Sequence, residues 1–213
     1  MKQESVIQIH DPRYQTQVRK NIAEVLTSFE KLDPELFNLF QLTIEKIFYA
    51  GSMVAGGGSS SGALGCIWLN PRAYWKEQDY LEFFVHELTH NLLFLDERRE
   101  THYPFYSELE KSENFALSAI LKRGRPLDKV IHSLFVVYEV LSFRIRHFNP
   151  AAKTFLHPDT VMLFQGAEDT LQSLRKVKPQ LLSEHLKNMI LELEKNLKPL
   201  KVKCYENQKF TNL

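Results

Sequence analysis

The sequence predicts a mainly helical protein with a small sheet element, an α+β arrangement, and three features support this fold class. Segment 79–97 carries apolar residues on every face, and no Gly or Pro interrupts it, which is typical of a buried helix. A second long apolar run, 126–148, also predicts a helix, with Pro126 at the favoured first position. The short apolar run 64–69 lies between Gly62 and Asn70-Pro71, as expected of a strand.

The other segments are also expected to be mostly helical. Apolar residues at helical spacing predict a helix over 14–30, and Asp33-Pro34 begins a second one that continues through Ile47 and Phe48. SENFALSAILKR predicts a further helix at 112–123, which Gly124 ends. Amphipathic patterns predict helices at 161–176 and 179–197, whereas DERRETHYPFYSE, after the 79–97 helix, is polar and contains a Pro turn. We expect helix 79–97 to pack against helix 126–148 within a single domain, residues 1–213.

One stretch of low complexity interrupts this pattern, the Gly/Ser-rich segment 51–62. Its composition favours a flexible loop rather than a helix, so we interpret it as a solvated linker. A lid over a site is the alternative interpretation. The segment lacks the Gly-Lys-Ser/Thr ending of a phosphate-binding P-loop, which argues against nucleotide binding.

Composition excludes some classes of function. The 213 residues are 44% hydrophobic, enough for a sizeable core, and 27 basic against 26 acidic residues give a net charge of +1. Such a balance provides no general field for nucleic acid or an anionic membrane. The N-terminal residues lack an apolar core of signal-peptide length, and we expect a cytoplasmic protein. Cys66 and Cys204 are then reduced thiols.

The sequence VHELTHN within segment 79–97 is the strongest functional signal. His86 and His90 are four residues apart, so on a helix their side chains lie next to each other and can bind one divalent ion. Glu87 can reach the open position of that ion. A buried helix accepts His, Glu and His together only when these groups are satisfied, because an unpaired buried charge is costly. The motif therefore predicts a metal site.

The third protein ligand decides the chemistry, and the sequence leaves two possibilities open. A glutamate among Glu108, Glu110 and Glu113 would give a zinc peptidase with Glu87 as the general base that activates water, although YSELEKSENF looks solvated. The other candidate is His132, within the apolar run VIHSLFVVYEVL. At heptad spacing it falls in a polar stripe along the predicted helix, made of Arg125, His132, Glu139 and Arg146. Such a stripe either lines a cavity or forms a buried ladder of ion pairs.

The succession SSSGALGCIWL, VHELTHNLLFLDE and SAILKRGRPLDKVIHS resembles the HExxH-type 2-oxoglutarate-dependent peptide β-hydroxylases, over about residues 59–148. These are iron enzymes that hydroxylate side-chain carbons in ribosomally made peptides. The resemblance implies Fe(II) bound by His86, His90 and His132. It also implies that Arg125 binds the C5 carboxylate of 2-oxoglutarate, with Ser118 as a helper. Three neutral imidazoles suit iron, and the planar guanidinium fits a carboxylate bidentately. Glu87 would then orient a histidine or have no direct role.

We therefore expect an Fe(II)- and 2-oxoglutarate-dependent dioxygenase that modifies a precursor peptide, with a leader peptide or a partner protein as further binding partners. The first alternative is an HExxH zinc metallopeptidase. The second is a non-catalytic peptide-binding protein with a vestigial metal site, which the complete set of candidate ligands makes weaker.

Overall fold

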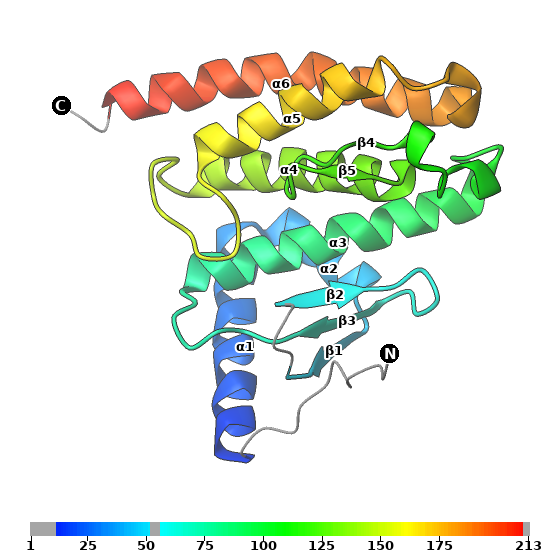
Figure 1. Cartoon of the computed structure of the whole chain (residues 1–213). Coiled ribbons are helices and arrows are strands. Elements are labelled where there is room, and N and C mark those ends of the chain that lie inside the picture. The colour runs from blue at the N-terminus through cyan, green and yellow to red at the C-terminus, as the bar shows by residue number, and fades with distance from the viewer. Residues whose placement is uncertain (1–11, 52–55, 211–213) are drawn as a thin grey trace. The chain divides into compact units, whose positions relative to one another are not determined.

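A computed structural model of the chain describes residues 12–51 and 56–210, and it is mainly helical with small sheet elements (Figure 1). The predicted fold class is confirmed. The chain forms two compact units, the first made of Met1–Phe94 with Thr154–Leu156 and the second of Leu95–Lys153 with His157–Leu213. That residues 1–213 act as a single domain stays a prediction.

The first unit combines helices with a three-stranded sheet. Its elements are α1 (Pro12–Leu32), α2 (Pro34–Thr43), β1 (Lys46–Tyr49), β2 (Gly57–Ser59), β3 (Cys66–Leu69) and most of α3 (Glu77–Arg99). The strand order is β1-β3-β2, with β1 parallel and β2 antiparallel to β3. The expected strand at 64–69 is thus confirmed as β3, the central strand.

The second predicted helix ends earlier than expected. Asp33 caps α2 by accepting a hydrogen bond from the backbone N–H of Leu36 at 3.1 Å, as expected, but the helix stops at Thr43. Ile47 and Phe48 belong to β1 instead, so the prediction of helix there was wrong. Their pairing with β3 explains the difference, because β-branched and aromatic residues suit a strand that has a partner.

Part of the Gly/Ser-rich segment is also a strand. Residues 57–59 form β2, so the predicted loop is wrong for these three residues, while 52–55 lie outside the described part of the chain. A Cβ at Gly57 would lie 2.2 Å from the Phe83 ring and 2.6 Å from the carbonyl oxygen of Trp68. The absence of a side chain at Gly57 therefore lets β2 approach both β3 and α3, and the strand lies under the motif helix (Figure 1).

Helix α3 carries the VHELTHN motif and is buried, as predicted. Its N-terminus is closed by Asp79, whose carboxylate accepts a hydrogen bond from the backbone N–H of Lys76 at 2.8 Å. Arg98 and Arg99 in its last turn complement the helix dipole. Near the motif, Phe84, Val85 and Leu88 are almost completely buried. The motif thus lies on a rigid, well-packed helix rather than on a loop.

The second unit is built on a long helix, α4 (Leu127–His147), which packs against α5 (Thr160–Leu174) and α6 (Glu184–Phe210), as Figure 1 shows. The predicted helices at 126–148, 161–176 and 179–197 are therefore confirmed, except that 179–181 is a short 3-10 turn. The short elements of the unit are η1 (Tyr106–Glu108), η2 (Ser112–Asn114), β4 (Ala116–Leu117), β5 (Gly124–Arg125) and η3 (Pro179–Leu181).

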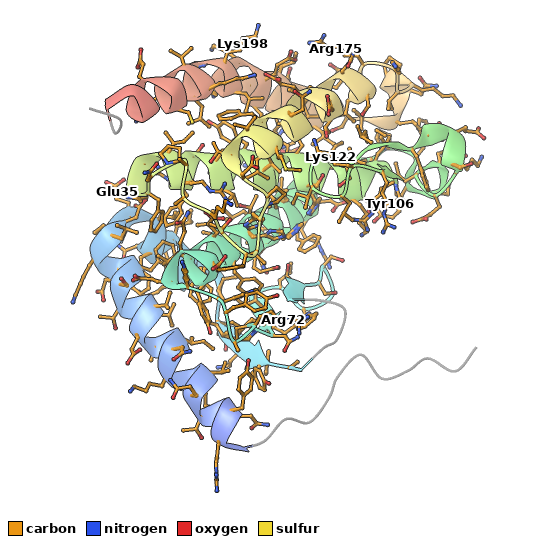
Figure 2. The ribbon with its side chains drawn as sticks, turned by 60° about the vertical axis from the view of Figure 1, so that its left-hand side comes forward. Glu35, Arg72, Tyr106, Lys122, Arg175 and Lys198 are labelled. Carbon is orange, nitrogen blue, oxygen red and sulfur yellow. The ribbon has the colours of Figure 1, made fainter. Side chains whose placement is uncertain are left out.

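The helix predicted at 112–123 does not form, and β4 pairs there with β5 as a small antiparallel hairpin. Side chains from α5 hold the extended backbone of β4: the Ser173 hydroxyl accepts from the N–H of Leu117, and the Thr170 hydroxyl donates to its carbonyl oxygen. The hairpin turn contains Lys122 (Figure 2), whose φ of 52° is not helical. Local helix propensity is thus overridden by contacts with α5.

Within the described part of the chain, no helix is both long and apolar enough to cross a membrane.

Candidate metal centre

His86 and His90 lie one turn apart on α3, and their Nε2 atoms are 3.1 Å from each other. Two imidazoles bound to one ion at about 2.0–2.1 Å would have their nitrogens about 3.0–3.4 Å apart. The observed separation therefore fits a shared divalent ion without rearrangement. It also fits a hydrogen bond between the rings when no ion is bound. The ring of Phe94 lies nearly parallel to the His90 ring, with centroids 6.1 Å apart.

Glu87 is buried beside this pair. Glu87 is only 3% exposed, and its Oε1 atom lies 3.9 Å from Nε2 of His86. The other oxygen, Oε2, is buried and has no hydrogen-bond partner among the described residues. Burial raises the pKa of Glu87 to about 7, and the nearby Ser59 hydroxyl of β2 offsets part of this increase without completing a hydrogen bond. A cation next to His86 would satisfy this orphaned oxygen, so the residues fit a metal ion.

Two further residues hold the motif in place. Asn91 is completely buried, and its side chain donates to the carbonyl oxygen of Glu87 at 2.9 Å while accepting from the N–H of Gly65 at 2.9 Å. Gly65 has φ +75°, and it immediately precedes β3. The amide of Asn91 therefore ties α3 to the start of the central strand. Sequence reasoning missed this role, although Asn91 directly follows the second motif histidine.

The remaining predicted residues lie in the second unit. His132 is 6% exposed and lies in the second turn of α4. Arg125 is in β5, two residues before α4 begins at Leu127, so the predicted helix face shared by Arg125 and His132 was wrong. Pro126 acts as the N-cap rather than the first helical residue. Because the motif histidines belong to the first unit, the third ligand stays a prediction.

The two residues expected to bind 2-oxoglutarate differ in their availability. Arg125 is half-buried, and its side chain has no ion pair or hydrogen bond among the described residues, so its guanidinium is available to an anion. Ser118 is completely buried, and its hydroxyl donates to Ser133 at 3.2 Å and accepts from the N–H of Leu121 at 3.3 Å. Its contacts support the hairpin turn against α4, and its role in cofactor binding stays a prediction.

The other charged candidates differ in their burial. On α4, burial raises the pKa of Glu139, and the charge of Arg146 acts in the opposite direction. Of the three glutamates considered as zinc ligands, Glu108 pairs with Lys111 at 2.8 Å and Glu113 lies 3.8 Å from Lys178, while Glu110 is exposed. Solvated charges at these glutamates agree with the polar character of their segment.

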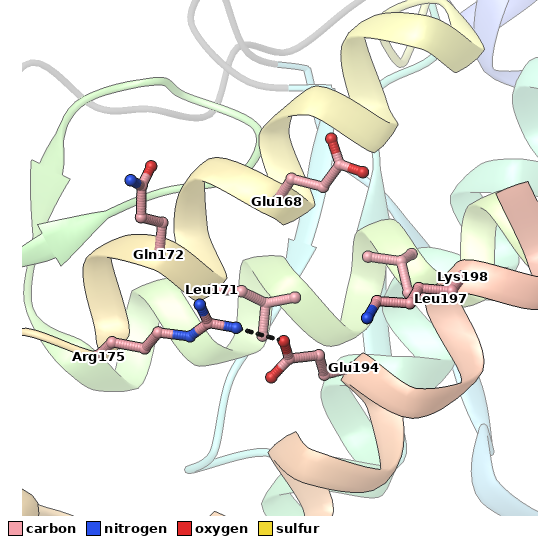
Figure 3. Close-up of a pocket in the computed structure, with 7 residues that line it drawn as sticks. All are labelled: Glu168, Leu171, Gln172, Arg175, Glu194, Leu197 and Lys198. Atoms are coloured by element: carbon pink, nitrogen blue, oxygen red, sulfur yellow. Dashed lines mark hydrogen bonds and ion pairs between the residues drawn. The ribbon is translucent and has the colours of Figure 1, made fainter.

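A groove of about 310 Å³ lies between α5 and α6 (Figure 3). Arg175 and Glu194 pair with each other across it at 2.5 Å, and Glu168 pairs with Lys201 at 2.6 Å. The charges along the groove thus largely neutralise one another. The residues that line it do not include a group of His, Cys, Asp and Glu side chains placed to hold a metal ion.

A second group of potential metal ligands lies in the second unit and was not predicted. Among the described residues, one set of at least three His, Cys, Asp or Glu side chains has its ligand atoms within 4.8 Å of one another: Asp96, His102 and His185. Asp96 and His102 fall in DERRETHYPFYSE, which we interpreted only as a polar segment. His185 is 83 residues further along the chain than His102, and no spacing rule links them.

The comparisons with known proteins add no family. No protein-family model matches the chain, and no curated protein matches it.

Proposed function

We propose that this chain is a metal-dependent enzyme that hydroxylates a side-chain carbon of a ribosomally made peptide, using Fe(II), 2-oxoglutarate and O₂. The observation that carries the proposal is the pair of convergent imidazoles, with Nε2 of His86 and Nε2 of His90 3.1 Å apart on a rigid helix. The choice of oxygenase chemistry comes from the resemblance of residues 59–148 to the peptide β-hydroxylases.

The residues are assigned as follows. His86 and His90, with His132 as the proposed third ligand, would hold Fe(II), which supplies the open positions at which the oxo acid and O₂ react. Arg125 would pair with the C5 carboxylate of the oxo acid through its planar guanidinium. Each turnover puts one oxygen atom of O₂ into a substrate C–H bond and the other into succinate, with release of CO₂.

The sheet next to the motif suits a peptide substrate. Strand β2 is an edge strand of the three-stranded sheet, and its last residue, Ser59, lies beside Glu87. Edge strands bind extended peptides through backbone hydrogen bonds, with side chains directed alternately to either face. A precursor peptide laid along β2 would therefore pass close to His86 and His90.

A second candidate is a zinc metallopeptidase, and the position of Glu87 favours it. Its carboxylate is buried beside His86, and Oε2 has no partner among the described residues, which is where a general base for a metal-bound water would stand. In the oxygenase, the same carboxylate only orients a histidine or balances the charge of the site.

Comparison of wild type with Glu87→Gln distinguishes the two candidates. Protein purified anaerobically is loaded with Fe(II) or with Zn(II) and given a candidate precursor peptide, and succinate and the peptide masses are measured. An oxygenase releases succinate, adds 16 Da to the peptide and retains most of its turnover in Glu87→Gln. A peptidase cleaves the peptide, and Glu87→Gln keeps the metal but loses at least about 100-fold in rate. If neither product forms with either metal, the proposed function is wrong.

A further inference from the structure

Two histidines from separate parts of the second unit converge on one carboxylate oxygen of Asp96. Nε2 of His102 lies 2.8 Å from Oδ2 of Asp96, and Nε2 of His185 lies 2.7 Å from the same atom. Asp96 is near the C-terminal end of α3, His102 follows that helix, and His185 is in the first turn of α6. The two imidazole rings have their centroids 5.8 Å apart.

The surroundings fix this convergence. Oδ1 of Asp96 accepts a hydrogen bond from Arg99 at 3.1 Å, so the carboxylate is oriented and presents Oδ2 to the two histidines. The segments that carry the histidines are also joined through their backbones, because the N–H of Ser183 donates to the carbonyl oxygen of His102 at 2.9 Å. His102 is 1% exposed and therefore has little freedom to turn away.

Two neutral imidazoles and one carboxylate are a ligand set that proteins use for zinc and other first-row divalent ions. Hydrogen bonds of 2.7–2.8 Å are shorter than the separation of about 3.3 Å between neighbouring ligands of a tetrahedral ion with bonds near 2.1 Å. The ligands therefore need to spread by about half an ångström. His185 can provide this movement, because its side chain is 32% exposed. The same exposed side leaves room for a water as the fourth ligand.

We propose that Asp96, His102 and His185 form a second metal site that binds Zn(II) and joins the end of α3, the segment after it and the start of α6. A bound ion would replace two hydrogen bonds by three metal bonds and fasten segments that are up to 89 residues apart. The site is independent of the proposed enzyme activity, since it shares no residue with the HExxH motif.

The test uses the full chain with the motif ligands removed by His86→Ala and His90→Ala together. In this background we expect one equivalent of Zn(II) to remain bound against a competing chelator, and Co(II) to give the intense visible absorption of a tetrahedral site. With His185→Ala added, the protein should no longer retain Zn(II) against the chelator, because its affinity for Zn(II) falls by more than about 100-fold. This loss exceeds the one typical of a residue that only supports a metal ligand. Lys187→Ala, in the same turn of α6, is the matched control and should keep it.

Thermal unfolding gives an independent measure. Zn(II) should raise the Tm of the His86→Ala/His90→Ala protein and of its Lys187→Ala derivative, but not of the His185→Ala derivative. Circular dichroism checks that each variant is folded. If the His185→Ala protein is not folded, Asp96→Asn is used in its place. If only the HExxH motif fails to bind metal, wild type should bind one equivalent of Zn(II), and His86→Ala and His90→Ala should not change that amount. The proposal is overturned if the motif-deleted protein binds no Zn(II), or if His185→Ala and Asp96→Asn bind it as Lys187→Ala does.

Discussion

A buried histidine inside an apolar helix needs a reason, and His132 is such a residue. It is 6% exposed, and it lies between Ile131 and Ser133, which are also buried. A neutral imidazole can be satisfied by a single neighbour, in which case it has only a structural role. It can equally serve as a metal ligand, as the proposed function requires. Substitution distinguishes these roles, because only a ligand controls the occupancy of the metal site.

We expect His132→Ala to lose Fe(II). Arg125→Ala should keep Fe(II) but bind 2-oxoglutarate at least about 10-fold more weakly, because a charge-assisted hydrogen bond to a carboxylate contributes about 1.5–3 kcal/mol. Anaerobic titration with 2-oxoglutarate, followed through the visible charge-transfer band, measures both properties. His147→Ala, at the last turn of the same helix, is the control. Wild-type iron binding by His132→Ala would exclude it as the third ligand.

At the scale of single elements, β2 depends on the absence of a side chain at Gly57. An added Cβ would lie 2.2 Å from Phe83 and 2.6 Å from the backbone oxygen of Trp68, and backbone atoms cannot move aside easily. Gly62 is a matched control, because a Cβ there would be 3.7 Å from the nearest atom, an ordinary contact. Substitution should therefore be tolerated at Gly62, in the turn that follows β2, but not at Gly57 within the strand.

We predict that Gly57→Ala lowers the free energy of unfolding by about 2 kcal/mol or more, since overpacking of this kind displaces both β3 and α3. Gly62→Ala should change it by less than about 0.5 kcal/mol. Urea unfolding monitored by tryptophan fluorescence provides the comparison. Equal stability of the two variants would mean that β2 does not pack as described.

Helix α4 provides a prediction about pH. Burial raises the pKa of Glu139 above its usual value near 4.5, and Arg146 opposes this only in part. A carboxyl group whose pKa is raised in the folded state keeps its proton to a higher pH than in the unfolded state. It therefore lowers the stability of the fold as the pH rises from 4.5 through the folded pKa. The destabilisation is complete above that folded pKa. Well below pH 4.5 the group is protonated in both states and contributes nothing.

Glu139→Gln should therefore be more stable than wild type at pH 8, with the difference shrinking as the pH falls to 4. Urea titrations at several pH values measure this difference, and Glu192→Gln, at an exposed glutamate of α6, serves as the control. A difference between Glu139→Gln and wild type that grows toward low pH would contradict the assignment.

At the scale of the whole molecule, the path of the chain between its two units depends on Asp79. After residues 95–153 of the second unit, Thr154–Leu156 returns to the first unit before the chain continues at His157. Oδ1 of Asp79 accepts hydrogen bonds from the N–H groups of Phe155 at 2.5 Å and Leu156 at 2.9 Å. The carboxylate is 1% exposed, and it also caps α3.

Asp79→Ala should therefore leave the N–H groups of Phe155 and Leu156 without their acceptor and lower the free energy of unfolding by about 2–3 kcal/mol. The rate of hydrogen exchange at these two amides should increase more than the rate at the amides of α1. Asp33→Ala, which removes the cap of α2, should cost about 1 kcal/mol and leave exchange at residues 155–156 unchanged. Unchanged exchange in Asp79→Ala would show that other contacts hold the segment.

The sequence by itself determined the features that depend on residues close together in the chain. Helix α3 and the adjacency of His86 and His90 follow from an uninterrupted apolar run and a spacing of four, and β3 follows from a short apolar run between turn residues. Only the tertiary structure decided the rest. Residues 116–125 form a hairpin because hydroxyls of α5 hold the backbone of β4, and Gly57–Ser59 forms a strand because Gly57, without a side chain, fits closely against β3 and α3. Asp96 and His185 meet across 89 residues, a separation at which no local pattern predicts contact. They meet because the start of α6 is held against the segment that follows α3, where the N–H of Ser183 donates to the carbonyl oxygen of His102 and both histidines bond to Asp96.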